Sequence, residues 1–149
     1  MSKNVHASCI AFEDCGVLIQ GPSGSGKSDL ALRLVDEGAA LVSDDYVALE
    51  ATGGDVTASP PPNIGGLLEV RGLGLITVPF VPEVRVALVI DLVERADVPR
   101  LPDPDDTHAE VLPGVNVPMV RLCAHDASTA AKIRLAVRAL RDGKVRTTL

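Results

Sequence analysis

Aromatic residues and cysteines are scarce in this sequence. It contains two Phe, one Tyr and no Trp in 149 residues, and its apolar residues, almost all Leu, Val, Ile and Ala, make up 46%. The three cysteines, Cys9, Cys15 and Cys123, are scattered without the spacing of a disulfide framework or a metal site. This pattern favours reduced thiols in a cytosol.

An excess of positive charge and long apolar runs are also missing. The formal net charge is −6, which argues against nucleic acid as the main partner. The first residues, MSKNVHAS, lack the apolar stretch of a signal peptide, and no run reaches the length that crosses a membrane. We therefore expect a cytoplasmic protein without a membrane partner. A chain of 149 residues suits a single domain over residues 1–149.

The most informative stretch begins with a short apolar run at residues 17–19, which is typical of a strand. The residues that follow, GPSGSGKS, fit the phosphate-loop pattern G-x-x-x-x-G-K-[ST]. Its glycines let the loop turn backbone N–H groups toward a phosphate. The predicted nucleotide-binding residues are Gly21, Pro22, Ser23, Gly24, Ser25, Gly26, Lys27 and Ser28, and we expect Lys27 to face solvent at the loop.

The residues on both sides of this motif support the same interpretation. Apolar residues after Ser28 follow a helical period that Gly38 closes, so the positive N-terminus of a helix would also face the anion. An ordinary Gly-Ser turn is the alternative, but strand, motif and helix agree with one another. Tyr46 is the only ring near the predicted site. We therefore expect recognition through phosphates and magnesium, with weak selectivity for the base.

Carboxylates that could bind a metal or accept a proton beside the phosphate loop occur at three points in the sequence. Asp44 and Asp45 follow a short apolar strand, the place where open α/β sheets bind ligands. Asp91 lies near the end of the longest apolar run and, by pattern alone, is the stronger candidate for a magnesium-associated aspartate. The choice between the pair and Asp91 stays open. Glu69 lies in an otherwise apolar stretch and needs a cation, either an arginine or a metal. His6 lies near the start of a strand predicted over residues 5–12, where a lone histidine is more often structural or exposed than catalytic.

The last predicted helix is capped by Asp126 or Ser128 and ends at Gly143. Its apolar residues are expected to face inward: Ala131, Ile133, Leu135, Ala136, Val137 and Leu140. Its other face is basic and carries Lys132, Arg134, Arg138 and Arg141, with Lys144 and Arg146 following. On an acidic protein this local reversal of charge could dock an acidic partner. A solvated helix face is the alternative interpretation.

Several of these motifs, taken in order, resemble a known family. The order of His6, GPSGSGKS, VSDDYV and LEVRGLG is similar to the catalytic domain of bacterial HPr kinase/phosphorylase, the serine kinase of the phosphotransferase-system carrier HPr. Longer members carry an extra N-terminal domain, and this chain resembles the short α-proteobacterial forms. The resemblance implies an α/β P-loop fold of the phosphoenolpyruvate-carboxykinase-like, HPr-kinase type, with a mixed sheet and flanking helices.

The resemblance also implies a role for each matching residue. Lys27 would be the phosphate-loop lysine, and Ser28 and Glu69 would contact magnesium. His6 would be the active-site histidine, and Asp45 would be the base that takes the proton from the acceptor serine. These roles suit phosphoryl transfer, which depends on positioning and neutralised charge more than on covalent chemistry.

The remaining expectations concern the reaction and its partners. Arg100, in a loop rich in proline and acid, would act on the transferring phosphoryl group. The donor would be ATP with Mg²⁺, or pyrophosphate in its place, and the acceptor would be an HPr-like phosphocarrier protein. In the reverse reaction, inorganic phosphate would attack phosphoserine and yield pyrophosphate. We also expect a homo-oligomer, with a hexamer as one candidate form.

Other phosphate-loop proteins fit less well. A guanylate-kinase-type enzyme would need a longer chain, more tyrosines and an arginine-rich lid. A regulatory GTPase would need the guanine-reading N-K-x-D, which the sequence lacks. A non-enzymatic nucleotide-sensing P-loop module that binds a protein partner is the alternative of another class. It predicts nucleotide binding without transfer to any serine.

Overall fold

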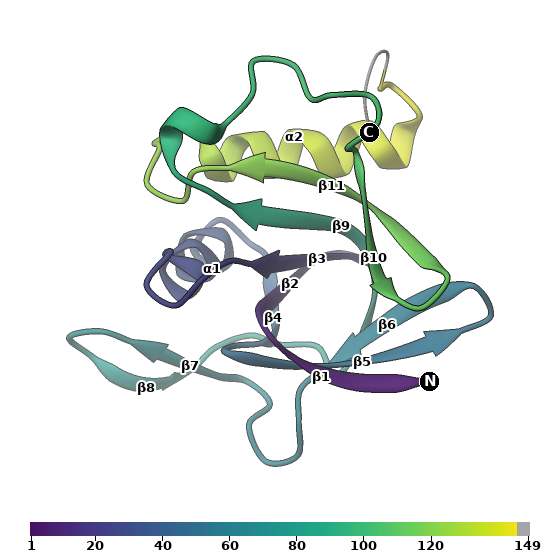
Figure 1. The fold of residues 1–149 in the computed structure, drawn as a ribbon. Coiled ribbons are helices and arrows are strands. Elements are labelled where there is room, and N and C mark those ends of the chain that lie inside the picture. The colour runs from purple at the N-terminus through teal and green to yellow at the C-terminus, as the bar shows by residue number, and fades with distance from the viewer. Residues whose placement is uncertain (146–149) are drawn as a thin grey trace.

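In residues 1–145, which the structure describes, a nine-stranded sheet carries two α-helices (Figure 1). The structure is a computed structural model. The strands of this sheet are β1 (Ser2–His6), β2 (Ser8–Phe12), β3 (Cys15–Gln20), β4 (Ala40–Ser43), β5 (Tyr46–Thr52), β6 (Asp55–Ser59), β9 (Val84–Leu92), β10 (His108–Leu112) and β11 (Val115–Leu122). A separate hairpin contains β7 (Leu67–Val70) and β8 (Gly74–Thr77), a 3-10 turn spans Arg95–Asp97, and the helices are α1 (Lys27–Asp36) and α2 (Thr129–Asp142).

The long strand β9 lies inside this sheet, as its apolar sequence predicts. It pairs in parallel with β3 on one side and β11 on the other, and its first residues pair antiparallel with β6. From β3 the sheet continues through β2 to β4, and from β6 it continues through β5 to β1. The sheet is therefore mixed, in agreement with the expected α/β fold class.

Several strand ends meet at one edge of the sheet, and this edge carries the predicted site. Strand β2 runs antiparallel to both β3 and β4, so β3 and β4 point in the same direction. Strands β9 and β11 share this direction because they pair in parallel with β3 and with each other. The carboxyl ends of these four strands and the start of β2 therefore lie along one edge, where open α/β sheets bind ligands.

The two faces of the sheet contribute to two separate hydrophobic cores. One core lies between the sheet and both helices and contains Ile19 of β3, Leu34 of α1 and Ile133 of α2. The other core contains Leu18 of β3 and Val47 of β5. The neighbours Leu18 and Ile19 point to opposite faces because side chains alternate along a strand. Both cores are built from aliphatic residues, as the composition predicts.

Helix α2 has the predicted ends, but not all of its apolar residues face inward. Ile133 and Val137 are buried, whereas Leu135 is 60% exposed and Ala131 is also exposed. The helical period of about 3.6 residues places positions 133 and 137 on one side and 131 and 135 on another. The expectation that all the apolar residues of this helix face the core was therefore wrong for these two.

The two glycines of the small hairpin form its turn. Gly72 and Gly74 lie at the turn between β7 and β8 with φ angles of 93° and 98°. A Cβ at either position would meet no atom of the described chain within 4 Å outside its immediate neighbours. They therefore supply the positive φ that this turn needs, and neither marks a close approach of the backbone.

Two further findings bear on the composition argument. All three cysteines are unpaired and buried, and burial raises the pKa of the Cys9 thiol to about 12. Such a thiol stays protonated and unreactive at neutral pH. No helix within residues 1–145 is long and apolar enough to cross a membrane.

Candidate active site

The glycine-rich loop at residues 21–26 joins β3 to α1 and borders an open cavity of about 750 Å³. This volume is in the range of small-molecule sites. Most of the predicted site residues line the cavity: His6, Ser23, Gly24, Gly26, Lys27, Ser28, Asp45 and Glu69. The remaining residues of the predicted loop, Gly21, Pro22 and Ser25, complete the connection from β3. The motif and its distant partners are thus brought together.

Gly26 fixes how the loop enters the helix. It caps α1 with a φ angle of 99°, a conformation that residues with a side chain rarely adopt. A Cβ at this position would lie 2.9 Å from the Cβ of Ala124, so the close approach of the neighbouring loop also requires glycine. The first N–H groups of α1 have no partner within the helix, which makes this end suitable for an anion.

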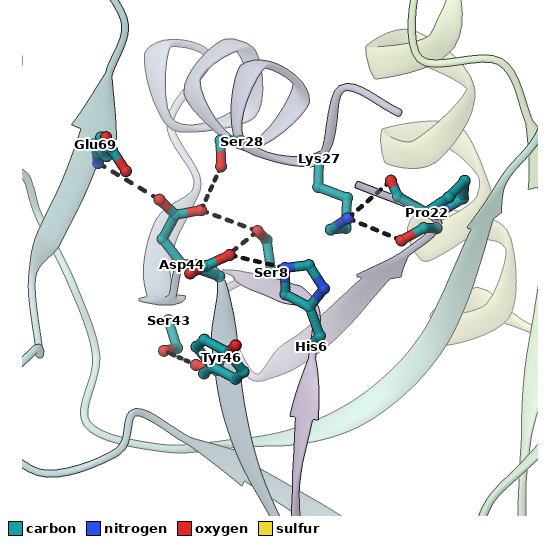
Figure 2. Close-up of polar contacts among 11 residues, drawn as sticks. His6, Ser8, Pro22, Lys27, Ser28, Ser43, Asp44, Tyr46 and Glu69 are labelled. Carbon is teal, nitrogen blue, oxygen red and sulfur yellow. Dashed lines mark hydrogen bonds and ion pairs between the residues drawn. The ribbon is translucent and has the colours of Figure 1, made fainter. Parts of the chain in front are cut away.

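Lys27 is buried, contrary to the expectation that it faces solvent. Its residue is 7% exposed, and its Nζ donates hydrogen bonds to the carbonyl oxygens of Gly21 at 2.8 Å and Pro22 at 3.1 Å (Figure 2). A buried ammonium group needs acceptors, and its own loop provides them. The positive charge is therefore held inside the curve of the loop.

Asp44 is the central acceptor of the site, a role that sequence analysis did not assign to it. Its residue is 8% exposed, and its Oδ1 accepts hydrogen bonds from the hydroxyl of Ser28 at 2.8 Å and that of Ser8 at 3.0 Å (Figure 2). Its Oδ2 accepts the backbone N–H of Glu69 at 3.4 Å. The sequence indicated only that Asp44 follows a strand. Its hydrogen bonds could not be predicted, because Ser8 and Ser28 come from distant parts of the sequence.

Asp45, the next residue, points into the cavity and pairs with His6. The Nε2 atom of His6 lies 2.8 Å from Oδ1 of Asp45, and both side chains are partly exposed. Asp45 has a φ of 70°, in the left-handed region that aspartate tolerates better than most residues. The ring of Tyr46 lies 5.3 Å from the ring of His6, between centroids. The two adjacent aspartates thus bind different partners, because the turn directs their side chains in different directions.

The hairpin of β7 and β8 provides the far wall of the cavity. Glu69 is exposed and lines the cavity, so the expectation of an apolar setting was wrong. Among the apolar residues that suggested such a setting, Leu68 is buried, whereas Leu73, Leu75 and Ile76 are exposed. Arg71 also lines the cavity. The sequence pattern did not single out Arg71, whose one signal is its position two residues after Glu69, just past the end of β7.

The oxygen atoms at this edge suit a hard cation. Mg²⁺ is commonly held by one or two carboxylates together with phosphates and water. Glu69 and Ser28 line the cavity with a carboxylate and a hydroxyl, and the buried carboxylate of Asp44 lies behind Ser28, whose hydroxyl donates to it. Within residues 1–145 no group of three or more His, Cys, Asp or Glu side chains is arranged to hold a metal by itself. Magnesium would therefore depend on the ligand's phosphates.

Two candidates lie apart from this group. Asp91 forms an ion pair with Arg121, with Oδ2 3.3 Å from Nε, and does not belong to the described lining of the cavity. A hydrogen bond to Asp106 raises the pKa of the Arg121 guanidinium. Arg100 is exposed, follows the 3-10 turn, and is likewise not among the described lining residues.

Fold and site together define an α/β domain whose glycine-rich loop, at the carboxyl edge of a mixed sheet, faces a cavity with acidic side chains. The family described as HPr Serine kinase C-terminal domain matches residues 1–145. This chain belongs to that family.

Proteins of similar sequence and structure support this family membership. The HPr kinase/phosphorylase of Cupriavidus necator is 39% identical over 134 residues, which are 83% of this chain and 41% of that protein. The HPr kinase/phosphorylase of Clostridium acetobutylicum is 35% identical over 128 residues, 79% of this chain and 41% of that protein. The chain therefore spans about two fifths of the length of these relatives. The solved HPr(Ser) kinase/phosphatase of Coxiella burnetii aligns with a TM-score of 0.80 and 31% identity, over 95% of this chain and 92% of that one.

The position of Lys27 leads to a prediction about anion binding. Lys27→Met keeps the aliphatic stem in its buried site and removes the ammonium group. The affinity for pyrophosphate with magnesium should fall about a hundredfold, or roughly 2.7 kcal/mol, as expected for the loss of charge-assisted hydrogen bonds. Calorimetric titration measures the affinity, and thermal unfolding checks that the variant is folded. Unchanged pyrophosphate affinity in a folded Lys27→Met variant would show that the loop does not bind phosphate.

Proposed function

We propose that this protein is a magnesium-dependent serine kinase/phosphorylase that acts on an HPr-like phosphocarrier protein. One observation carries the proposal: two adjacent aspartates beside the glycine-rich loop have separate partners. Asp44 is bound to the Ser28 hydroxyl, and Asp45 is bound to His6. One carboxylate is thus available for a metal and the other for a proton, the two tasks that phosphoryl transfer to serine requires.

The loop and the buried carboxylate would hold the donor. The N-terminal N–H groups of α1 and the ammonium group of Lys27 would bind the phosphates of ATP. Ser28, Asp44 and Glu69 would hold magnesium, which neutralises charge on the phosphates of the donor. Pyrophosphate offers the same phosphates, so we expect it to serve as a second donor.

Asp45 would act as the proton acceptor in the kinase direction. The serine oxygen of the carrier attacks the γ-phosphorus, the bond to the β-phosphate breaks and ADP leaves, and the serine proton moves to the Asp45 carboxylate. His6 binds Oδ1 of Asp45, which leaves Oδ2 for the serine. In the reverse direction inorganic phosphate attacks phosphoserine, pyrophosphate forms, and Asp45 returns the proton to the serine oxygen.

An arginine would neutralise charge on the transferring phosphoryl group. The family resemblance assigns this role to Arg100, and that assignment stays a prediction. Arg71 is a second candidate, because it lines the cavity on the same hairpin as Glu69. We further propose that the chain forms a homo-oligomer, with a hexamer as one candidate form, and that it acts in the cytoplasm, where ATP and reduced thiols coexist.

The direct test is transfer of a phosphoryl group. The protein is incubated with ATP, magnesium and a purified HPr-like carrier, and mass spectrometry identifies the modified residue. We expect one phosphoserine on the carrier with wild-type protein and none with Lys27→Met. ATP binding without transfer to any carrier serine would favour the nucleotide-sensing module.

The roles of the aspartates can be separated by substitution. Asp45→Asn keeps the shape of the side chain and removes the proton acceptor, so it should lower kcat in both directions by roughly a hundredfold or more. Nucleotide affinity should change little. Asp91→Asn is the matched control, and it should leave both rates within about twofold and lower the melting temperature, because it removes a partner of Arg121. An active Asp45→Asn beside a folded but inactive Asp91→Asn would reverse the assignment.

The basic face of α2 leads to a prediction about the carrier. Arg134 pairs with Glu37 at 3.0 Å and Arg141 pairs with Glu13 at 3.2 Å, so part of the predicted docking face is already neutralised. Lys132 and Arg138 are exposed. Lys144 is also exposed, and Arg146 lies outside the described residues. The docking hypothesis therefore depends mainly on Lys132 and Arg138.

Changing Lys132 and Arg138 together to Glu should raise the KM for the carrier about threefold to tenfold at low salt, and less at high salt. Nucleotide affinity should not change. Lys3 and Arg85 are exposed on β1 and β9, and changing both to Glu alters the net charge equally. Equal effects of the two double variants would indicate a general charge effect, and no effect of either would place docking elsewhere.

A further inference from the structure

The cavity extends beyond the phosphate loop to a residue that the proposed reaction does not use. His125 lines it from the connection between β11 and α2. Of the described residues that line the cavity, His6 and His125 carry rings, and His6 is bound to Asp45. Tyr46, the ring expected near the donor, lies beside His6 and is not part of that described lining. His125 is therefore the ring available to a ligand at this end.

The backbone around His125 is tied to neighbouring elements. Arg33 of α1 donates a hydrogen bond to the carbonyl of Ala124, and the N–H of Asp126 donates to the carbonyl of Cys123 at 3.3 Å. Arg95, after β9, donates to the carboxylate of Asp126 at 2.6 Å. The residues on both sides of His125 are thus held by α1 and by the β9 connection. The ring is exposed, but its backbone is held in place.

His125 also lies against the phosphate loop. A Cβ placed on Gly26 would be 3.3 Å from Cε1 of His125. Gly26 is the residue that caps α1, so the ring lies beside the end of the helix that would bind phosphates. A ligand on the loop would therefore come within reach of this ring.

The sheet order places His125 and Asp44 on opposite sides of the loop. From β3 the strands run through β2 to β4 in one direction and through β9 to β11 in the other. Asp44 follows β4 and His125 follows β11. The N–H of Glu69 binds Asp44, so the hairpin belongs to the Asp44 side. Asp44, Asp45 and the hairpin thus lie on one side of the loop, and His125 lies on the other.

This arrangement gives the donor a direction. The serine of a phosphate-loop motif marks the end where magnesium bridges the β- and γ-phosphates. In this protein that serine is Ser28, which is bound to Asp44. The γ-phosphate must also face Asp45 for transfer to a serine. The nucleoside is attached to the other end of the phosphate chain and must therefore extend away from this side.

We propose that His125 binds the nucleoside of a nucleoside triphosphate donor by stacking its imidazole ring on the base. This inference rests on the proposed function, because it takes the donor to be a nucleotide. Stacking tolerates every base, since each base has a π-face. His125 would therefore strengthen ATP and GTP binding alike and would contribute nothing to the binding of pyrophosphate, which has no nucleoside.

The test compares two ligands on four proteins. Isothermal titration calorimetry with magnesium measures the Kd of the non-hydrolysable ATP analogue AMPPNP and the Kd of inorganic pyrophosphate. The proteins are wild type, His125→Ala, His125→Phe and His108→Ala. His108 is exposed on β10 and is not one of the described lining residues, so it serves as the matched control. Thermal unfolding of each variant checks the fold.

We expect His125→Ala to weaken AMPPNP binding about tenfold and to leave pyrophosphate binding within about twofold. His125→Phe should restore AMPPNP binding to within about threefold of wild type, because it keeps a ring. A parallel loss for both ligands would assign His125 to the phosphates and overturn the proposal, as would unchanged AMPPNP binding in His125→Ala. Failure of wild type to bind either ligand would overturn the proposed function as well.

Discussion

The arrangement of the site depends on the hydrogen bonds that Asp44 accepts. A carboxylate that is 8% exposed would be costly to bury without donors. Its donors come from β2, from the first turn of α1 and from β7: the Ser8 hydroxyl, the Ser28 hydroxyl and the N–H of Glu69. One buried charge therefore holds the end of β4, the start of the helix and the hairpin together. Loss of any donor would leave Asp44 less satisfied and would loosen the corresponding wall of the cavity.

The strand directions explain why residues far apart in sequence meet at this carboxylate. Strands β3, β4, β9 and β11 point the same way, so the loop, the aspartate pair and His125 all follow strand ends at one edge. Strand β2 runs the other way, which brings Ser8 and the preceding His6 to that same edge. The mixed sheet thus gathers the glycine-rich loop, both aspartates, Ser8 and His6 at one edge without a long insertion.

Local patterns in the sequence predicted the strand, loop and helix around Lys27 and the central position of β9. These features depend on neighbouring residues, as do the ends of α2. The burial of Lys27 and the role of Asp44 could not be predicted, because both depend on contacts between distant segments. Glu69 was misjudged for the same reason, since its hairpin buries Leu68 in the core but leaves Leu73, Leu75 and Ile76 exposed. His125 carries no motif, and only the sheet order places it at the cavity.

Whether Asp44 anchors the metal site is tested most directly by the binding of Mn²⁺, a spectroscopic substitute for magnesium. Electron paramagnetic resonance in the presence of AMPPNP follows this binding. If Asp44 and Ser28 hold the metal beside the donor phosphates, wild-type protein will bind Mn²⁺ together with the nucleotide, and Asp44→Asn will lose most of this binding while remaining folded. Equal Mn²⁺ binding by wild type and a folded Asp44→Asn variant would contradict the account.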